Sequence, residues 1–124
     1  MILRNFVVFE GGDGTGTSTQ LGILKGKAAA ADISACFTCE PTDGPIGRLI
    51  RSALRGDTPL CPETVARLFA ADRGQHLYGP GGIVELCEAG RLVVCDRFVP
   101  SSLVYQGLDS PAGLPEELNG RFPY

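Results

Sequence analysis

The chain has 124 residues, of which 44% are hydrophobic and 20% are charged. This length and composition suit one folded domain with a substantial core, and they exclude an intrinsically disordered chain. The net charge of −3 argues against a nucleic-acid-binding surface, and five cysteines without a signal peptide or a bilayer-spanning apolar stretch favour a cytoplasmic location without membrane contact.

The first third of the chain predicts a strand, a glycine-rich loop and a helix. Residues 5–10 are a short run of β-branched and aromatic side chains, which is typical of a strand buried on both faces. Residues 18–31 carry good helix formers with leucines at helical spacing. The glycine-rich stretch 11–16 is therefore expected to join a strand to a helix.

The remaining chain continues the alternation of strands and helices. In chain order we expect a strand over 35–39, a helix through 46–54, a helix from Pro62 that Gly79-Pro-Gly-Gly82 interrupts, its resumption over 83–89 and a strand over 91–96. Beyond Gly107 the sequence predicts only loop. This order indicates an α/β fold with a parallel sheet, whose ligands bind beyond the carboxyl ends of the strands.

The glycine-rich loop matches the phosphate-binding pattern G-x-x-x-x-G-K-[ST] in both glycines and in the final hydroxyl. Backbone N–H groups of such a loop surround a polyphosphate at a helix N-terminus, and the hydroxyl of Ser18 is a ligand for Mg²⁺. The predicted ATP phosphate-binding residues are Gly11, Gly12, Asp13, Gly14, Thr15, Gly16, Thr17 and Ser18. The alternative is a glycine-rich turn without a ligand.

Thr17 departs from this pattern, because it stands where the motif has a lysine. Cations at a transferring phosphoryl group contribute about 10³ to 10⁵ in rate, so catalysis is expected to suffer more than nucleotide binding through the backbone. Lys25 and Lys27 lie a helical turn or more further on. The sequence does not indicate whether either lysine reaches back.

Four segments, taken in order, resemble bacterial thymidylate kinases. They are FVVFEGGDGTGTSTQ at 6–20, EPTDGPIGRLIR at 40–51, LFAADRGQHL at 68–77 and VVCDRFVPSSLVYQG at 93–107. The resemblance implies a P-loop NTPase fold of the nucleoside monophosphate kinase type and Mg²⁺-dependent phosphorylation of dTMP by ATP to dTDP, in dTTP biosynthesis. The resemblance also makes the homodimer of that family a candidate assembly for this chain.

The resemblance assigns a role to individual residues around the phosphates. Asp13 would orient the acceptor phosphate and, with Arg97, would be catalytic. Asp96 and Ser18 would hold Mg²⁺. Arg97 and Arg51 would bind the phosphate of dTMP, a task that suits the forked guanidinium group.

A second set of residues would hold the nucleoside, again by resemblance. Phe69 would stack on thymine, Arg73 and Gln106 would hydrogen-bond its edge with Ser102 nearby, Tyr105 would sit against the deoxyribose, and Glu40 would line the acceptor site. Structural alternatives stay open: Phe69 as a core residue and Asp72 with Arg73 as a solvated pair. His76 is expected on the helix surface.

Two cysteines bear on this interpretation. Cys36 and Cys39 have the C-x-x-C spacing of a metal site, but residues three apart on a strand point to opposite faces, so we expect two small buried side chains instead. Cys39 also stands where bacterial relatives have an arginine, giving T-C-E-P in place of T-R-E-P. A second cation is therefore missing beside Thr17. The resemblance also leaves open that Thr17 marks a subgroup of the family with threonine at the lysine position, and not an inactive enzyme.

The chain is shorter than members of the family, so we expect residues 1–124 to form a single, C-terminally truncated P-loop kinase domain. The sheet order would be two, three, one, without the later strands, the arginine-bearing lid and the adenine-contacting loop. The first strand would then be an uncovered apolar edge. The alternatives to an active thymidylate kinase are an inactive remnant that at most binds nucleotide, and a kinase for another deoxynucleoside monophosphate.

Overall fold

The computed structural model describes residues 3–10, 17–98 and 111–123, with Thr17 and Ser18 as backbone only. Its elements are β1 (Phe6–Phe9), α1 (Thr17–Ala30), β2 (Ala35–Cys39), α2 (Pro45–Arg55), α3 (Pro62–Tyr78), α4 (Ile83–Glu88), β3 (Leu92–Asp96) and α6 (Leu114–Asn119). The expected strands and the expected helices up to residue 89 are confirmed to within a few residues at each end. No helix in these described ranges is long and apolar enough to cross a membrane.

The three strands form one parallel sheet in the order β1-β3-β2, which confirms the expected order. The register pairs Asp96 with Phe9 on one side and with Cys39 on the other. The carboxyl ends of all three strands are therefore level. As a result, the residues that follow the strands meet at one edge of the sheet.

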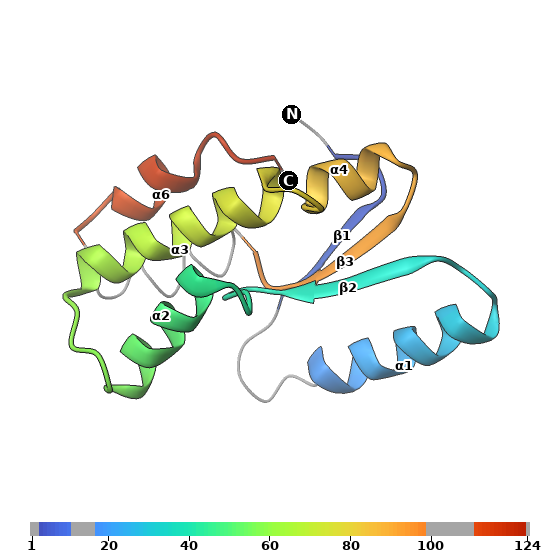
Figure 1. Ribbon diagram of the computed structural model, residues 1–124, viewed down its shortest axis with the longest axis horizontal. Coiled ribbons are helices and arrows are strands. Elements are labelled where there is room, and N and C mark those ends of the chain that lie inside the picture. The colour runs from blue at the N-terminus through green and yellow to red at the C-terminus, as the bar shows by residue number, and fades with distance from the viewer. Residues whose placement is uncertain (1–2, 11–16, 99–110, 124) are drawn as a thin grey trace.

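Helices cover the sheet on both sides. Figure 1 shows α1 on one side, next to β2, and α3, α4 and α6 together on the other. The main apolar core lies on the α3 side, where α3 and α4 meet the sheet. Its buried members are Leu77, Ile83, Cys87, Val93, Cys95 and Phe98, with Phe6, Val8 and Cys36 packed against them.

The expectation that the first strand is buried on both faces is wrong. Within the described residues β1 pairs with β3 alone and forms an edge of the sheet, as the expected sheet order implies. Phe6 and Val8 face the core, whereas Val7 points to the other face and is 41% exposed. An apolar run of this length does not distinguish a central strand from an edge strand.

The segment after Gly107 is not entirely loop, because α6 lies within it. Gly113, with φ 83°, precedes this helix, a proline occupies its first turn, and Glu116 and Glu117 follow there. Glycine accepts this left-handed backbone at little cost, proline suits the first turn, and carboxylates favour a helix N-terminus. These start signals were present, but six residues are too few to show a helical periodicity.

Candidate functional site

Three polar residues follow the level strand ends: Glu10, Arg97 and Glu40. The backbone N–H of Arg97 donates to the Phe9 carbonyl at 2.8 Å, and that of Glu40 donates to the Asp96 carbonyl at 3.2 Å. The sheet ladder thus continues one residue beyond the strands. This holds the three positions side by side.

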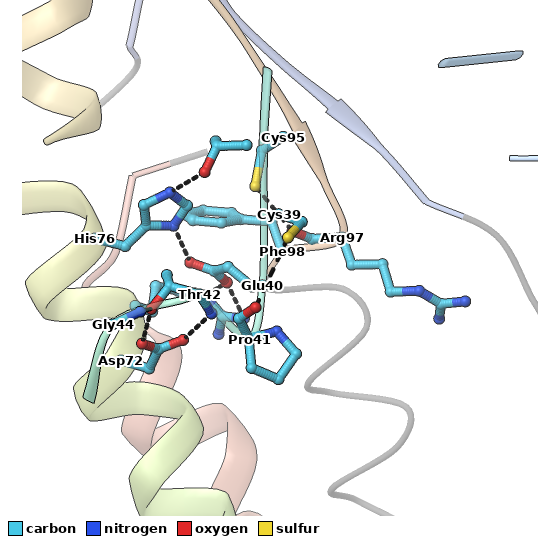
Figure 2. Close-up of polar contacts among 12 residues, drawn as sticks. Cys39, Glu40, Pro41, Thr42, Gly44, Asp72, His76, Cys95, Arg97 and Phe98 are labelled. Carbon is cyan, nitrogen blue, oxygen red and sulfur yellow. Dashed lines mark hydrogen bonds and ion pairs between the residues drawn. The ribbon is translucent and has the colours of Figure 1, made fainter. Parts of the chain in front are cut away.

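Arg97 has a left-handed backbone, with φ 69°. A non-glycine residue in this region costs about 1 kcal/mol or more, so its surroundings must hold it there. The carboxylate of Glu10 does so by accepting the N–H of Phe98 at 2.6 Å, and the thiol of Cys95 donates to the Arg97 carbonyl at 3.1 Å. Figure 2 shows the side chain of Arg97 pointing away from Glu40. The turn therefore sends a cation outward while Phe98 goes into the core.

A cavity of about 250 Å³ opens at the carboxyl end of β2, beneath α1. It is lined by Leu21, Lys25, Phe37, Thr38, Cys39, Thr42, Asp43 and Asp96. Oδ1 of Asp96 is buried there without a hydrogen-bond partner among the described residues. Nζ of Lys25 lies 5.3 Å from the centre of the Phe37 ring. Of the two lysines that the sequence left open, the structure thus brings Lys25 and not Lys27 to the cavity.

Arg51 lies beside Cys39, where the resemblance leads one to expect an arginine. Its Nη2 donates to the carbonyl oxygen of Pro41 and lies 3.8 Å from Cys39 Sγ. Its Nε is buried and has no partner within the described ranges. Burial raises the pKa of the Cys39 thiol, and the guanidinium of Arg51 offsets part of that rise. Cys39 and Cys36 lie on opposite sides of β2, as expected, but both are half-buried and neither is fully covered.

The loop after β2 is held by Asp72 of α3. The carboxylate of Asp72 accepts the N–H of Thr42 at 2.8 Å and its hydroxyl at 2.6 Å, and Thr42 Oγ1 in turn accepts the N–H of Gly44 at 3.2 Å. Gly47 lies so close beneath this loop that a Cβ atom there would overlap the Thr42 carbonyl. Asp72 is buried, so the solvated-pair alternative for Asp72 and Arg73 is wrong.

Glu40 and two residues of α3 form a buried charged cluster. Nε and Nη2 of Arg73 lie 2.8 Å and 2.7 Å from Glu40 Oε1, while Nδ1 of His76 lies 2.9 Å from Glu40 Oε2. The side chain of Glu40 is 2% exposed and that of His76 is 11% exposed. The expectation that His76 lies on the helix surface is wrong, because its other ring nitrogen is 2.7 Å from the Thr38 hydroxyl of β2 (Figure 2).

The cluster extends to a residue that the sequence analysis missed. Nη1 of Arg73 donates to Oδ1 of Asn119, the last residue of α6. Asn119 is buried and is held in turn by a 2.8 Å hydrogen bond from Nδ2 to the Pro115 carbonyl. The guanidinium of Arg73 also lies 4.8 Å from the centre of the Phe98 ring. A buried asparagine in a short helix gave no signal in the sequence.

The predicted site residues fall into three groups. Asp96, Arg97, Glu40 and Arg51 lie at the carboxyl edge of the sheet, and Phe69, which is half-buried, lies one turn before Arg73 on α3. Thr17 and Ser18 begin α1, so the helix starts directly after the glycine-rich stretch. The others, Gly11, Gly12, Asp13, Gly14, Thr15, Gly16, Ser102, Tyr105 and Gln106, lie outside the described residues.

Comparisons with known proteins agree on one family. A family model described as thymidylate kinase matches residues 9–120. A Treponema pallidum protein named "Putative thymidylate kinase" is 51% identical over 122 residues, 98% of this chain and 58% of that protein. A thymidylate kinase from Thermomicrobium roseum is 41% identical over 102 residues, 82% of this chain and 48% of that protein. The chain thus spans about half the length of these relatives.

A solved structure shows the same fold. The crystal structure of thymidylate kinase from Ehrlichia chaffeensis superposes with a TM-score of 0.75 at 28% identity, over 93% of this chain and 64% of that one. The parallel sheet with helices on both sides is therefore the P-loop kinase arrangement that the sequence predicted. The matched residues include the strand ends and the α3 cluster described above. This chain belongs to the thymidylate kinase family.

Proposed function

We propose that the chain acts in the cytoplasm in the phosphorylation of dTMP by ATP, which yields dTDP and ADP. The observation that carries the proposal is the level edge of the sheet, where Asp96, Arg97 and Glu40 occupy neighbouring positions and Asp96 lines a cavity. Ligands of parallel α/β sheets bind at this edge. Family membership supplies the identity of the two nucleotides.

ATP phosphates are assigned to the loop from Gly11 to Ser18, at the N-terminus of α1, where backbone N–H groups and the helix dipole favour anions. Asp96 and Ser18 are proposed to hold Mg²⁺, which would neutralise charge on the transferring phosphoryl group. Oδ1 of Asp96, which is buried and has no partner in the described part of the chain, fits this role because carboxylate oxygens are preferred magnesium ligands. Ser18 would add its hydroxyl.

The acceptor phosphate is assigned to two arginines at the sheet edge. The left-handed turn directs Arg97 outward, and Arg51 keeps a buried Nε whose hydrogen has no acceptor among the described residues. Asp13 is proposed to orient the acceptor for in-line attack, so that catalysis consists of positioning and charge neutralisation. Lys25 lines the same cavity as Cys39 and is proposed to supply part of the missing positive charge.

The nucleoside is assigned to α3 and to the segment that follows β3. Phe69 would stack on thymine, Arg73 and Gln106 would bind its edge with Ser102 nearby, and Tyr105 would contact the deoxyribose. The structure modifies one assignment. Both carboxylate oxygens of Glu40 are occupied by Arg73 and His76, so Glu40 is proposed to act through Arg73.

A second function, nucleotide binding without turnover, is favoured by two specific residues. Thr17 stands where the phosphate-loop motif has a lysine, and Cys39 stands where the resemblance places an arginine, so each position lacks a cation. Backbone N–H groups can hold a polyphosphate without them, but stabilisation of the transferring group depends on positive charge.

Titration of the chain with dTMP in the presence of Mg²⁺, by calorimetry, tests the proposal. We expect Arg97→Met to weaken dTMP binding by about tenfold or more, because it removes a charge-assisted hydrogen bond. Thymidine, which has no phosphate, should bind equally well to both proteins. The matched control is Arg48→Met, which removes an exposed arginine of α2.

A coupled assay of ADP release, with ATP and Mg²⁺, then separates the two functions. ADP release that depends on dTMP supports the kinase, and faster release by dUMP or dCMP would identify another acceptor. Binding without ADP release supports the binding-only function, and Thr17→Lys should then raise the rate. Absence of both binding and turnover would contradict the proposal.

A further inference from the structure

The guanidinium of Arg73 is buried with more donors than its neighbours use. An arginine has five N–H donors, and Arg73 is 1% exposed. Its contacts with Glu40 and Asn119 occupy one hydrogen on each of its three nitrogens. One hydrogen on each terminal nitrogen therefore has no acceptor among the described residues. Buried donors are normally paired, so these two hydrogens remain available to a further acceptor.

The position of this guanidinium is set by a chain of contacts from three elements. On one side, Thr38 of β2 holds His76, and His76 holds the second oxygen of Glu40, so the carboxylate cannot rotate away from Arg73. On the other side stands Asn119 of α6. Asp72, the neighbouring carboxylate on α3, does not compete for Arg73, because both its oxygens bind Thr42.

We propose that His76 and Asn119 are positioning residues that fix Arg73 as a reader of the pyrimidine base and so set the preference for thymine over cytosine. This rests on the proposed function, in which Arg73 contacts the edge of the base. Thymine presents the O4 acceptor at the position where cytosine presents an amino donor. A guanidinium offers only donors, so it pairs with O4 and leaves the cytosine amino group opposite another donor.

How strongly Arg73 discriminates between thymine and cytosine depends on how rigidly its guanidinium is held. A guanidinium that can swing aside loses its hydrogen bond to thymine and also stops opposing cytosine. Loss of either positioning residue should therefore weaken dTMP binding more than dCMP binding. The ratio of the dTMP and dCMP affinities is insensitive to partial unfolding. An unfolded fraction of a variant lowers both apparent affinities by the same factor, which cancels in the ratio.

The experiment compares dissociation constants for dTMP and dCMP by calorimetry, with Mg²⁺ and the whole chain. We expect Asn119→Leu and His76→Phe to lower the preference for dTMP at least tenfold. Asn119→Asp, which keeps an acceptor for Arg73, should retain most of it. Gln75→Ala removes an exposed side chain next to His76 and should leave the ratio unchanged.

A second measurement follows Arg73 without any nucleotide. In ¹⁵N-labelled protein the Nε–H resonance of Arg73 should be sharp and slow to exchange with solvent, and both Asn119→Leu and His76→Phe should broaden it or speed its exchange. If the native chain binds neither dTMP nor dCMP, the proposed function and the proposed base selectivity both fail. The Nε–H resonance then decides by itself whether His76 and Asn119 fix the position of Arg73. If dTMP binds and the ratio is the same in all variants, the inference is overturned while the proposed function stands.

Discussion

The two sides of the sheet are covered in different ways. On the α3 side, helix α3 buries five residues, Ala66, Ala70, Asp72, Arg73 and Leu77, and two of these carry charges that bind polar groups outside the helix. On the α1 side, Ala28 alone is buried among the side chains of α1 that the structure describes, and Ile23 is 49% exposed. The same sheet therefore has a tightly packed face and a loosely covered one.

The difference follows from the two helix sequences and from what each side has to do. Helix α1 carries Gly22, Gly26 and a run of alanines, which bury little apolar surface. It borders the cavity and follows the predicted phosphate loop. Regions that bind ligands are commonly drawn from the less stable parts of a protein. In the proposed function, the α3 side holds the fold and orients the base, while the phosphates bind on the α1 side.

The largest expected effect tests whether the α3 side holds the fold. Arg73→Leu leaves Glu40 buried with His76 as its one remaining partner among the residues that the structure describes, and breaking a buried ion pair in this way costs about 3–5 kcal/mol of unfolding free energy. Urea denaturation measures the loss. The exposed Arg48→Leu should change stability by less than about 0.5 kcal/mol. Equal effects of the two substitutions would show that the buried charged cluster on the α3 side does not hold the fold.

The hydrogen bonds by which Asp72 holds the loop after β2 should contribute somewhat less to stability. Asp72→Ala removes two hydrogen bonds to Thr42 and leaves its N–H without an acceptor, a loss of about 1–3 kcal/mol. Thr42→Val removes one of the same two bonds. In a double-mutant cycle of urea melts the combined loss should therefore be smaller than the sum. Simple additivity would show that the two residues do not act together.

The same substitution should change stability in opposite directions in α1 and in α2. A Cβ atom at Gly22 or Gly26 would meet nothing within 4 Å, so alanine at either position should stabilise α1 by about 0.5–1 kcal/mol. At Gly47 of α2 the added methyl group overlaps the Thr42 carbonyl, so alanine should destabilise. Urea denaturation measures the change in stability of each variant, and amide exchange measures the change within α1. Destabilisation by Gly22→Ala would mean that α1 packs more tightly than described.

The smallest effect concerns chemistry and not stability. Cys61 is exposed, and the hydroxyl of Thr64, at 3.1 Å, lowers the pKa of its thiol. Burial raises the pKa of Cys39, Cys87 and Cys95. Because the thiolate is the reactive form, iodoacetamide near pH 7.5 should alkylate Cys61 before these three, as read by mass spectrometry of peptides. Thr64→Val should shift the reaction of Cys61 to higher pH.

Much of the fold could be predicted because it depends on local patterns. Apolar runs marked the three strands, and Pro45 and Pro62, which stand in the first turns of α2 and α3, are typical helix starts. The strand order and the family came from motifs such as the glycine loop and Asp96-Arg97, which have a definite place in this kind of sheet. The short helix α6 and the exposed face of β1 were missed, because short segments carry weak periodicity.

The sequence by itself determined the elements, the family and the two departures at Thr17 and Cys39, since each is a matter of residue type at a given spacing. Only the tertiary structure decided which side chains meet. It placed His76 against Glu40 and Asn119 against Arg73, and it brought Lys25 to the cavity and not Lys27. These contacts join residues of different elements, so they depend on how strands and helices pack, which local periodicity does not encode.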